Sequence, residues 1–133
     1  MQRYAKHYQR SQVMTASPGQ LLLLAYDGAI RFLREAGAAM AKRDLASQSD
    51  AIVRAQSILL YLLQSLNHDA DAALADNLDR IYRYLYDRLT RANVDDDLQG
   101  IEEALGMLGS LRGAWEEAEG QVRGAAPAAV GAS

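Results

Sequence analysis

The fold is decided by a stretch near the start of the chain, residues 16–40, which reads ASPGQLLLLAYDGAIRFLREAGAAM. Ser17 is a preferred helix N-cap residue, Pro18 suits the first helical position because its missing N–H costs nothing there, and Gln20 completes a capping box. Behind this start, apolar residues recur at helical spacing: Leu22, Tyr26, Ala29, Leu33, Ala36 and Met40. The stretch therefore predicts a helix from Pro18 to about Lys42.

Three further helices are predicted by the same kinds of signal. An Asp44 cap opens a helix over residues 45–66, another helix follows over residues 71–92, and three aspartates at 95–97 open a last helix that fades around Gly120. The predicted core stripes are Ile52, Ala55, Leu59, Leu62 and Leu66; then Leu74, Leu78, Ile81, Leu85 and Leu89; then Ile101, Leu105, Leu108, Leu111 and Trp115. Because short turns force neighbouring helices to run in opposite directions, we expect an all-α protein, an antiparallel four-helix bundle.

The two ends of the chain differ from this bundle. Residues 1–16 are polar and basic and form a short N-terminal segment, residues 17–120 form the bundle, and residues 121–133 are expected to be a flexible, disordered tail of small residues. The N-terminus lacks the apolar stretch of a signal peptide, and no apolar run approaches the ~20 residues that cross a bilayer. We therefore expect a cytoplasmic protein without membrane insertion.

Composition excludes several classes of function. The 133 residues include 14 Lys and Arg, 17 Asp and Glu, no cysteine and two histidines, for a net charge of −3. This balance gives no electrostatic footprint for nucleic acid, and the missing cysteines exclude disulfides and thiolate chemistry. Neither His7 nor His68 has a Glu three residues before it, as a di-iron bundle requires. We expect no metal, no cofactor and no catalytic constellation, hence a protein that is not an enzyme.

Two helices carry more apolar surface than one core stripe needs. Residues 21–26 and 58–63 are each apolar throughout, and six consecutive residues point in every direction around a helix. Tyrosine, apolar with a polar tip, is favoured on surfaces that a partner covers. Core packing would explain any one of these residues, but as a set they favour a binding groove. We expect it to be lined by Ile58, Tyr61, Leu62, Tyr82, Tyr86 and Leu89.

The N-terminal segment is a candidate cover for this groove. Tyr4 and Tyr8 stand four residues apart, as on one helix face, and positive charges at residues 3, 6 and 10 contrast with the acidic last helix. A short helix lying on the bundle when the groove is empty would explain this pattern. A frayed basic terminus would explain it equally well.

A series of motifs follows in order along residues 4–119. They are Tyr4-x3-Tyr8-x4-Val13-x-Thr15-Ala16-Ser17-Pro18-x-x-Leu21, Leu24-Ala25-Tyr26-Asp27-Gly28-Ala29-Ile30-Arg31-Phe32-Leu33, Arg54-Ala55-Gln56, Asn77-Leu78-Asp79-x-Ile81-Tyr82-x-Tyr84-Leu85, Arg88-Leu89-x-x-Ala92-Asn93 and Leu108-x-x-Leu111-Arg112-x-Ala114-Trp115. The series resembles the flagellin-specific export chaperones of bacterial flagellar type III secretion. Two departures are Leu24-Ala25 where Met-Leu is usual, and Ala72-Ala73 where Gly-Gly is frequent.

The resemblance implies a cytoplasmic chaperone, without a cofactor, that binds the disordered C-terminal segment of flagellin. Binding would prevent premature polymerisation, and the complex would be presented to a component of the export gate. A monomer binding flagellin one-to-one is expected, and the N-terminal tyrosine linked to gate handover falls on Tyr4. The alternative is a structural or regulatory helical bundle that self-associates through the same apolar surface.

Overall fold

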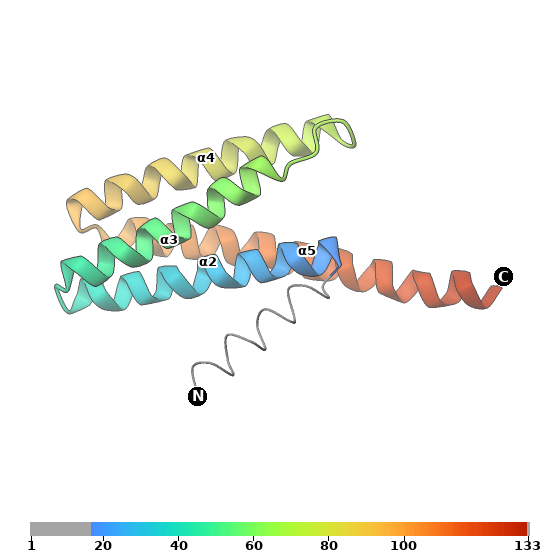
Figure 1. Cartoon of the computed structure of the whole chain (residues 1–133), viewed down its shortest axis with the longest axis horizontal. Helices are drawn as coiled ribbons and strands as arrows, with labels where there is room; N and C mark the ends of the chain where they lie inside the picture. Colours follow the sequence, from blue (N-terminus) through green and yellow to red (C-terminus); the bar gives the residue numbers. More distant parts are fainter. Residues whose placement is uncertain (1–16, 133) are drawn as a thin grey trace.

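The computed structural model describes the backbone of residues 17–132 and the side chains of residues 17–121. Within that part of the chain, the helices are α2 (Pro18–Ala41), α3 (Leu45–Gln64), α4 (Ala72–Asp95) and α5 (Leu98–Ala132). Consecutive helices run antiparallel and pack on each other, and α5 also packs on α2, which closes the bundle (Figure 1). The prediction of an all-α, antiparallel four-helix bundle is confirmed. The N-terminal segment, residues 1–16, lies outside the described residues.

The helix starts agree with the predicted capping residues. The Ser17 hydroxyl accepts a hydrogen bond from the Gln20 backbone N–H at 3.2 Å, and the Gln20 side chain accepts one from the Ser17 N–H at 2.9 Å. Asp44 accepts a hydrogen bond from the backbone N–H of Ser47 at 3.2 Å. Each bond satisfies an N–H that a helix start would otherwise leave unpaired.

The helix ends differ more from the prediction. Helix α4 continues past residue 92 to Asp95 and is ended by Asp96, which adopts the left-handed conformation with φ 52°. Helix α5 does not end around Gly120 but continues to Ala132. Ala and Gly residues dominate this last stretch, which has no apolar core stripe, but alanine itself favours a helix. The flexibility of residues 121–133 stays a prediction.

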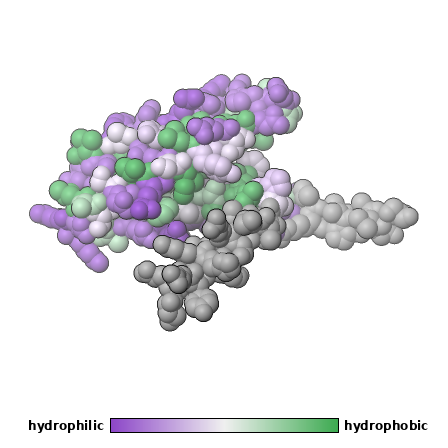
Figure 2. All heavy atoms as spheres, viewed as in Figure 1, coloured by the Kyte–Doolittle hydropathy of each residue, from purple (hydrophilic) through white to green (hydrophobic). Residues whose placement is uncertain are grey.

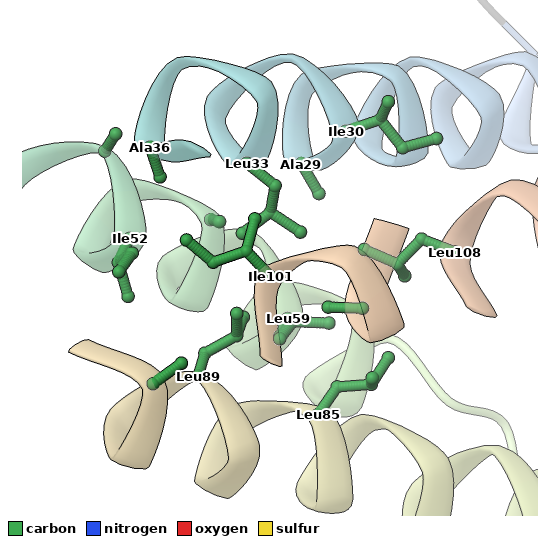
Figure 3. Close-up of a cluster of buried hydrophobic side chains, with 14 of the residues drawn as sticks. Ala29, Ile30, Leu33, Ala36, Ile52, Leu59, Leu85, Leu89, Ile101 and Leu108 are labelled. Carbon is green, nitrogen blue, oxygen red and sulfur yellow. The ribbon is translucent and has the colours of Figure 1, made fainter. Parts of the chain in front are cut away.

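The core is built from all four helices (Figure 3). Leu59, Leu85 and Leu108 are completely buried, as predicted, whereas Ile81 and Leu105 are only partly buried. On α4 the predicted stripe was wrong at Ile81 and at Leu74, which is 44% exposed, because it selected Leu and Ile in preference to Ala and Tyr. The residues of α4 that enter the core are Ala75, Leu78, Tyr82, Leu85, Leu89 and Ala92.

Helices α2 and α3 approach closely where Gly28 faces α3. A Cβ atom at Gly28 would lie 3.1 Å from the Ile58 Cδ1 atom, closer than ordinary van der Waals contact. A glycine inside a helix costs ~1 kcal/mol relative to alanine, and here its missing side chain allows the two helices to approach. No helix in the described residues has the length and apolar character that a membrane-spanning helix needs.

Candidate binding surface

The six residues predicted to line a groove do not share one exposed surface. Leu62, Tyr82 and Leu89 lie in the core, with exposed fractions of 1%, 1% and 0%. Their helices turn these side chains towards the core, and Leu62 and Tyr82 also line the pocket described below, so contact of these three residues with a partner stays a prediction. Ile58 and Tyr86 are partly buried against the core, and Tyr61 is exposed. Their contacts with a partner stay a prediction, and Tyr4 and Tyr8 lie outside the described residues.

An apolar pocket instead lies at one end of the bundle. Towards the turn that joins them, α3 and α4 diverge from α2 and α5 (Figure 1). A pocket of about 220 Å³ occurs there, and its lining is mostly apolar. It is lined by residues of all four helices, including Leu22, Leu62, Leu66, Leu74, Leu78, Tyr82 and Trp115. We call this end of the molecule the open end.

A chain of hydrogen-bonded aromatic side chains, two of which line this pocket, joins α2, α4 and α5. The Trp115 indole N–H donates to the Tyr26 hydroxyl at 3.2 Å, and the Tyr26 and Tyr82 hydroxyl oxygens are 2.6 Å apart. Burial raises the pKa of Tyr26 and of Tyr82, so both hydroxyls stay protonated across the physiological range. Sequence patterns placed Tyr26 and Trp115 on core stripes but could not show that their polar atoms meet.

A second pocket adjoins the first at the start of α2. Its volume is about 350 Å³, and it shares Leu22 and Trp115 with the first pocket. Pro18, Gly19, Ala118 and Glu119 complete its lining. An apolar surface therefore extends from the N-terminus of α2 to the turn between α3 and α4.

A separate group of apolar side chains is exposed on α3. Val53, Leu60 and Tyr61 are 52%, 43% and 50% exposed. Figure 2 shows hydrophobic residues interspersed among hydrophilic ones on the visible face of the bundle. Single exposed apolar residues are normal on a protein surface. Val53 and Leu60, however, are seven residues apart, so they share one side of α3. This outer surface of α3 is a second candidate for contact with another protein.

The opposite end of the bundle is held by buried polar side chains. Gln48, 1% exposed, donates from its amide nitrogen to the Asn93 side-chain oxygen at 3.2 Å and to Asp96 at 2.9 Å. Further along α3, Gln56 donates to the Tyr86 carbonyl oxygen at 3.0 Å and to the Thr90 hydroxyl at 2.8 Å. These bonds tie α3 to α4, and we call this end the closed end.

An ion-pair cluster joins α4 to α5 at the closed end. The Arg88 guanidinium lies 2.9 Å from Asp97 and 3.1 Å from Glu103, and the Tyr84 hydroxyl also donates to Glu103. The bond from Tyr84 and the charge of Arg88 lower the pKa of Glu103, and the bond from Arg88 lowers the pKa of Asp97. In the described part of the chain, no three His, Asp or Glu side chains converge as metal ligands would.

Comparison with known proteins identifies the family. A family model described as "Flagellar protein FliS" matches residues 1–122. The chain belongs to the FliS family. The flagellar secretion chaperone FliS of Bacillus subtilis is 33% identical over 111 residues, covering 84% of this chain and 82% of that protein. The flagellar secretion chaperone FliS of Salmonella typhimurium is 34% identical over 115 residues, covering 86% of this chain and 85% of that protein.

The fold comparison agrees with the FliS assignment. A solved structure described as the crystal structure of a flagellar chaperone from bacteria superposes with a TM-score of 0.74 at 19% identity. It covers 88% of this chain and 98% of that chain. The FliS relatives are named as chaperones, not enzymes, so the predicted resemblance to a flagellar chaperone family is confirmed.

Proposed function

We propose that this chain is a cytoplasmic export chaperone for flagellin. It binds the disordered C-terminal segment of flagellin, prevents premature polymerisation, and delivers the subunit to the flagellar type III export gate. The observation that carries this proposal is membership of the FliS family over residues 1–122, with relatives named as flagellar secretion chaperones. The apolar pockets at the open end and the exposed apolar residues of α3 supply candidate contact surfaces.

Burial of a small apolar area can offset the free-energy cost of ordering the flagellin segment. Ordering a disordered segment costs about 2–5 kcal/mol. At ~25 cal/mol per Å² of buried apolar area, roughly 80–200 Å² offsets that cost. A single aromatic side chain buries about that area. Two or three well-seated apolar side chains along a wrapped segment would therefore offset the ordering cost, and the remaining contacts have to offset the translational and rotational freedom lost on association.

The direct test is calorimetric titration of the chain with the C-terminal segment of the flagellin from the same organism. We expect a one-to-one complex, and flagellin without this segment serves as the control. Sedimentation of the free chain over a range of concentrations tests the alternative. A chain that self-associates and ignores flagellin would be a structural or regulatory bundle, and our proposal would be wrong.

The predicted contact residues are tested by charge insertion and by deletion. Tyr61→Glu places a charge on the exposed face of α3 and should weaken flagellin binding, while Gln99→Glu adds the same charge at an exposed position of α5 as a control. Removing residues 1–14 should preserve or tighten binding, because a cover that competes for the groove lowers apparent affinity. Weaker binding after the deletion would make the segment part of the binding surface.

A further inference from the structure

The cationic side chains of α2 differ from those of the other helices in how they are paired. Each of α3, α4 and α5 has at least one arginine in an ion pair with a carboxylate of this chain. Of the ten Lys and Arg residues among residues 17–121, four form such a pair and six do not. The six are Arg31, Arg34, Lys42 and Arg43, on α2 or in the turn after it, and Arg80 and Arg91 on α4. Cations without a carboxylate partner are therefore concentrated at α2.

Three of these cations lie along the outward side of α2. Successive residues of an α-helix are rotated by about 100°, so Lys42, eleven residues after Arg31, lies on nearly the same side of the helix. Arg34 is one turn after Arg31, beside this line, and all three residues are exposed. Glu35 is the one acidic residue of the segment, so residues 31–42 have a net charge of +2. We call their exposed side the basic face.

Arg31 stacks on an aromatic ring instead of pairing with a nearby carboxylate. Asp27 and Glu35 are each four residues from Arg31, the spacing of a helical ion pair, yet neither forms one with it. The Arg31 guanidinium carbon lies 5.0 Å from the centre of the Phe32 ring, and that of Arg54, from α3, lies 5.8 Å from it. Phe32 is only partly buried. Its ring therefore holds two guanidiniums at the boundary between α2 and α3.

These two guanidiniums keep most of their hydrogen-bond donors available. A guanidinium has five N–H donors in its plane, and contact with an aromatic face does not use them. Arg54 donates from Nε to Asp50 at 3.0 Å, and Arg31 donates to no described residue. A carboxylate can accept two such bonds at once, and less conformational entropy is lost when the guanidinium is already held in place. The arrangement therefore suits carboxylates of a partner.

Neither end of this chain can supply those carboxylates. Residues 1–16 contain three Lys and Arg residues and no Asp or Glu, and residues 121–133 contain one Arg and no Asp or Glu. The net charge of −3 disfavours nucleic acid and anionic membranes, and Glu35 interrupts the basic face that such a polyanion would contact. A protein segment can place its acidic residues beside the cations and an apolar residue beside Phe32. The observations therefore favour a protein.

We propose that the basic face of α2 binds an acidic segment of a second protein partner. Carboxylates of that segment accept hydrogen bonds from Arg31 and Arg34, and an apolar side chain next to them packs on the Phe32 ring. The inference goes beyond the proposed function, because no residue of the basic face lines the pockets at the open end. The acidic partner can therefore bind while the open end is occupied.

The first test uses a labelled glutamate-rich peptide with interspersed leucines as the probe. The same peptide with every glutamate replaced by glutamine is the control. Fluorescence anisotropy at low salt should show that only the glutamate peptide binds the wild-type chain, and its affinity should fall as salt is added, because exposed charges are screened. Equal binding of the two peptides, or binding of neither, would overturn the inference.

The second test locates the binding with matched charge changes. Arg31→Gln with Arg34→Gln removes two cations of the basic face, and Arg80→Gln with Arg91→Gln removes two exposed cations of α4 that also lack an ion pair. The first pair of substitutions should weaken binding of the glutamate peptide roughly 2- to 30-fold, corresponding to two exposed ion pairs, and the second less than about 2-fold. Thermal melts check that both variants are folded. Equal losses would show that binding follows net charge alone, and the inference would be wrong.

Other occupants of the basic face give different results. Flagellin-segment affinity should be unchanged in the Arg31→Gln, Arg34→Gln variant, and a loss would mean that flagellin itself contacts this face. Self-association that these substitutions abolish would identify a second copy of the chain. Tighter binding of a single-stranded oligonucleotide or of anionic vesicles than of the glutamate peptide would identify a polyanion. Each of these results would overturn the inference, whereas a chain that binds the acidic peptide but not flagellin would contradict only the proposed function.

Discussion

The two ends of this bundle are held by different kinds of contact. At the closed end, Gln48 and the Arg88 cluster connect α3, α4 and the start of α5 through hydrogen bonds of fixed geometry. At the open end, α3 and α4 diverge from the other helices, Leu74 is 44% exposed, and apolar pockets remain between the helices. The two ends therefore have different roles. Polar contacts fix the register of the helices at one end, and the other end stays available to a partner without unfolding the bundle.

The largest expected effect is a difference in the free energy of unfolding between alanine substitutions of two leucines, one near each end of α4. Leu89 is completely buried towards the closed end, so Leu89→Ala should lower the free energy of unfolding by about 2–5 kcal/mol. Leu74→Ala at the open end should cost less than ~1 kcal/mol, because much of that side chain already faces solvent. Chemical denaturation of both variants measures the two values. Similar losses would show that the open end is as tightly packed as the closed end.

The next effect concerns the buried amide of the closed end. Gln48→Ala leaves the oxygens of Asn93 and Asp96 without its donor, and should destabilise the bundle by about 1–3 kcal/mol. Ser65→Ala removes an exposed hydroxyl bonded to the Tyr61 carbonyl at the open end, and should change stability by less than ~0.5 kcal/mol. Thermal melts of the two variants compare polar groups at both ends. A larger loss of stability for Ser65→Ala than for Gln48→Ala would show that polar contacts stabilise the open end more than the closed end.

A smaller effect is expected at the start of α2, beside the second pocket. Ser17→Ala removes the N-cap bond to Gln20 and should cost ~1 kcal/mol. Flagellin binding should survive, because a cap stabilises the helix rather than contacting the partner. Calorimetric titration alongside a melt separates these quantities. Lost binding at unchanged stability would mean that Ser17 touches flagellin.

The smallest effect is an acid-dependent loss at the closed end. Asp97 and Glu103 have folded-state pKa values below their ordinary values of 3.8 and 4.5, so their bonds stabilise the fold above those values. This contribution is lost as the pH falls through the lowered pKa values. The melting temperature of Arg88→Met should therefore fall below that of wild type at pH 7, and the gap should narrow towards pH 3. Arg83→Met, on the exposed side of α4, controls for the change in net charge. A difference in melting temperature that stays constant with pH would contradict the lowered pKa values of Asp97 and Glu103.

The sequence predicted the helices well because their signals are local. The capping box at Ser17 and the cap at Asp44 each depend on residues three positions apart. The phase of α4 was predicted less well, because a leucine-based pattern undervalues Ala75 and Tyr82. Tyrosine fits a core only when its hydroxyl finds a partner, and that partner, Tyr26, is 56 residues away. Of the pocket lining, only Leu62 and Tyr82 were among the predicted groove residues, since the lining comes from all four helices.

The packing of α2 on α5 has a consequence for how the chain folds. Apart from the contact of Tyr26 on α2 with Tyr82 on α4, the other packed pairs of helices in the described residues are neighbours in sequence, so their contacts form quickly and over short loops. Closure of the ring, including the ion pair between Asp27 and Arg112, requires the end of the chain to return to its beginning. During synthesis, the first three helices leave the ribosome with the part of α2 that packs on α5 uncovered. We therefore expect cooperative folding to wait until α5 has been made, and chains truncated before residue 108 to aggregate.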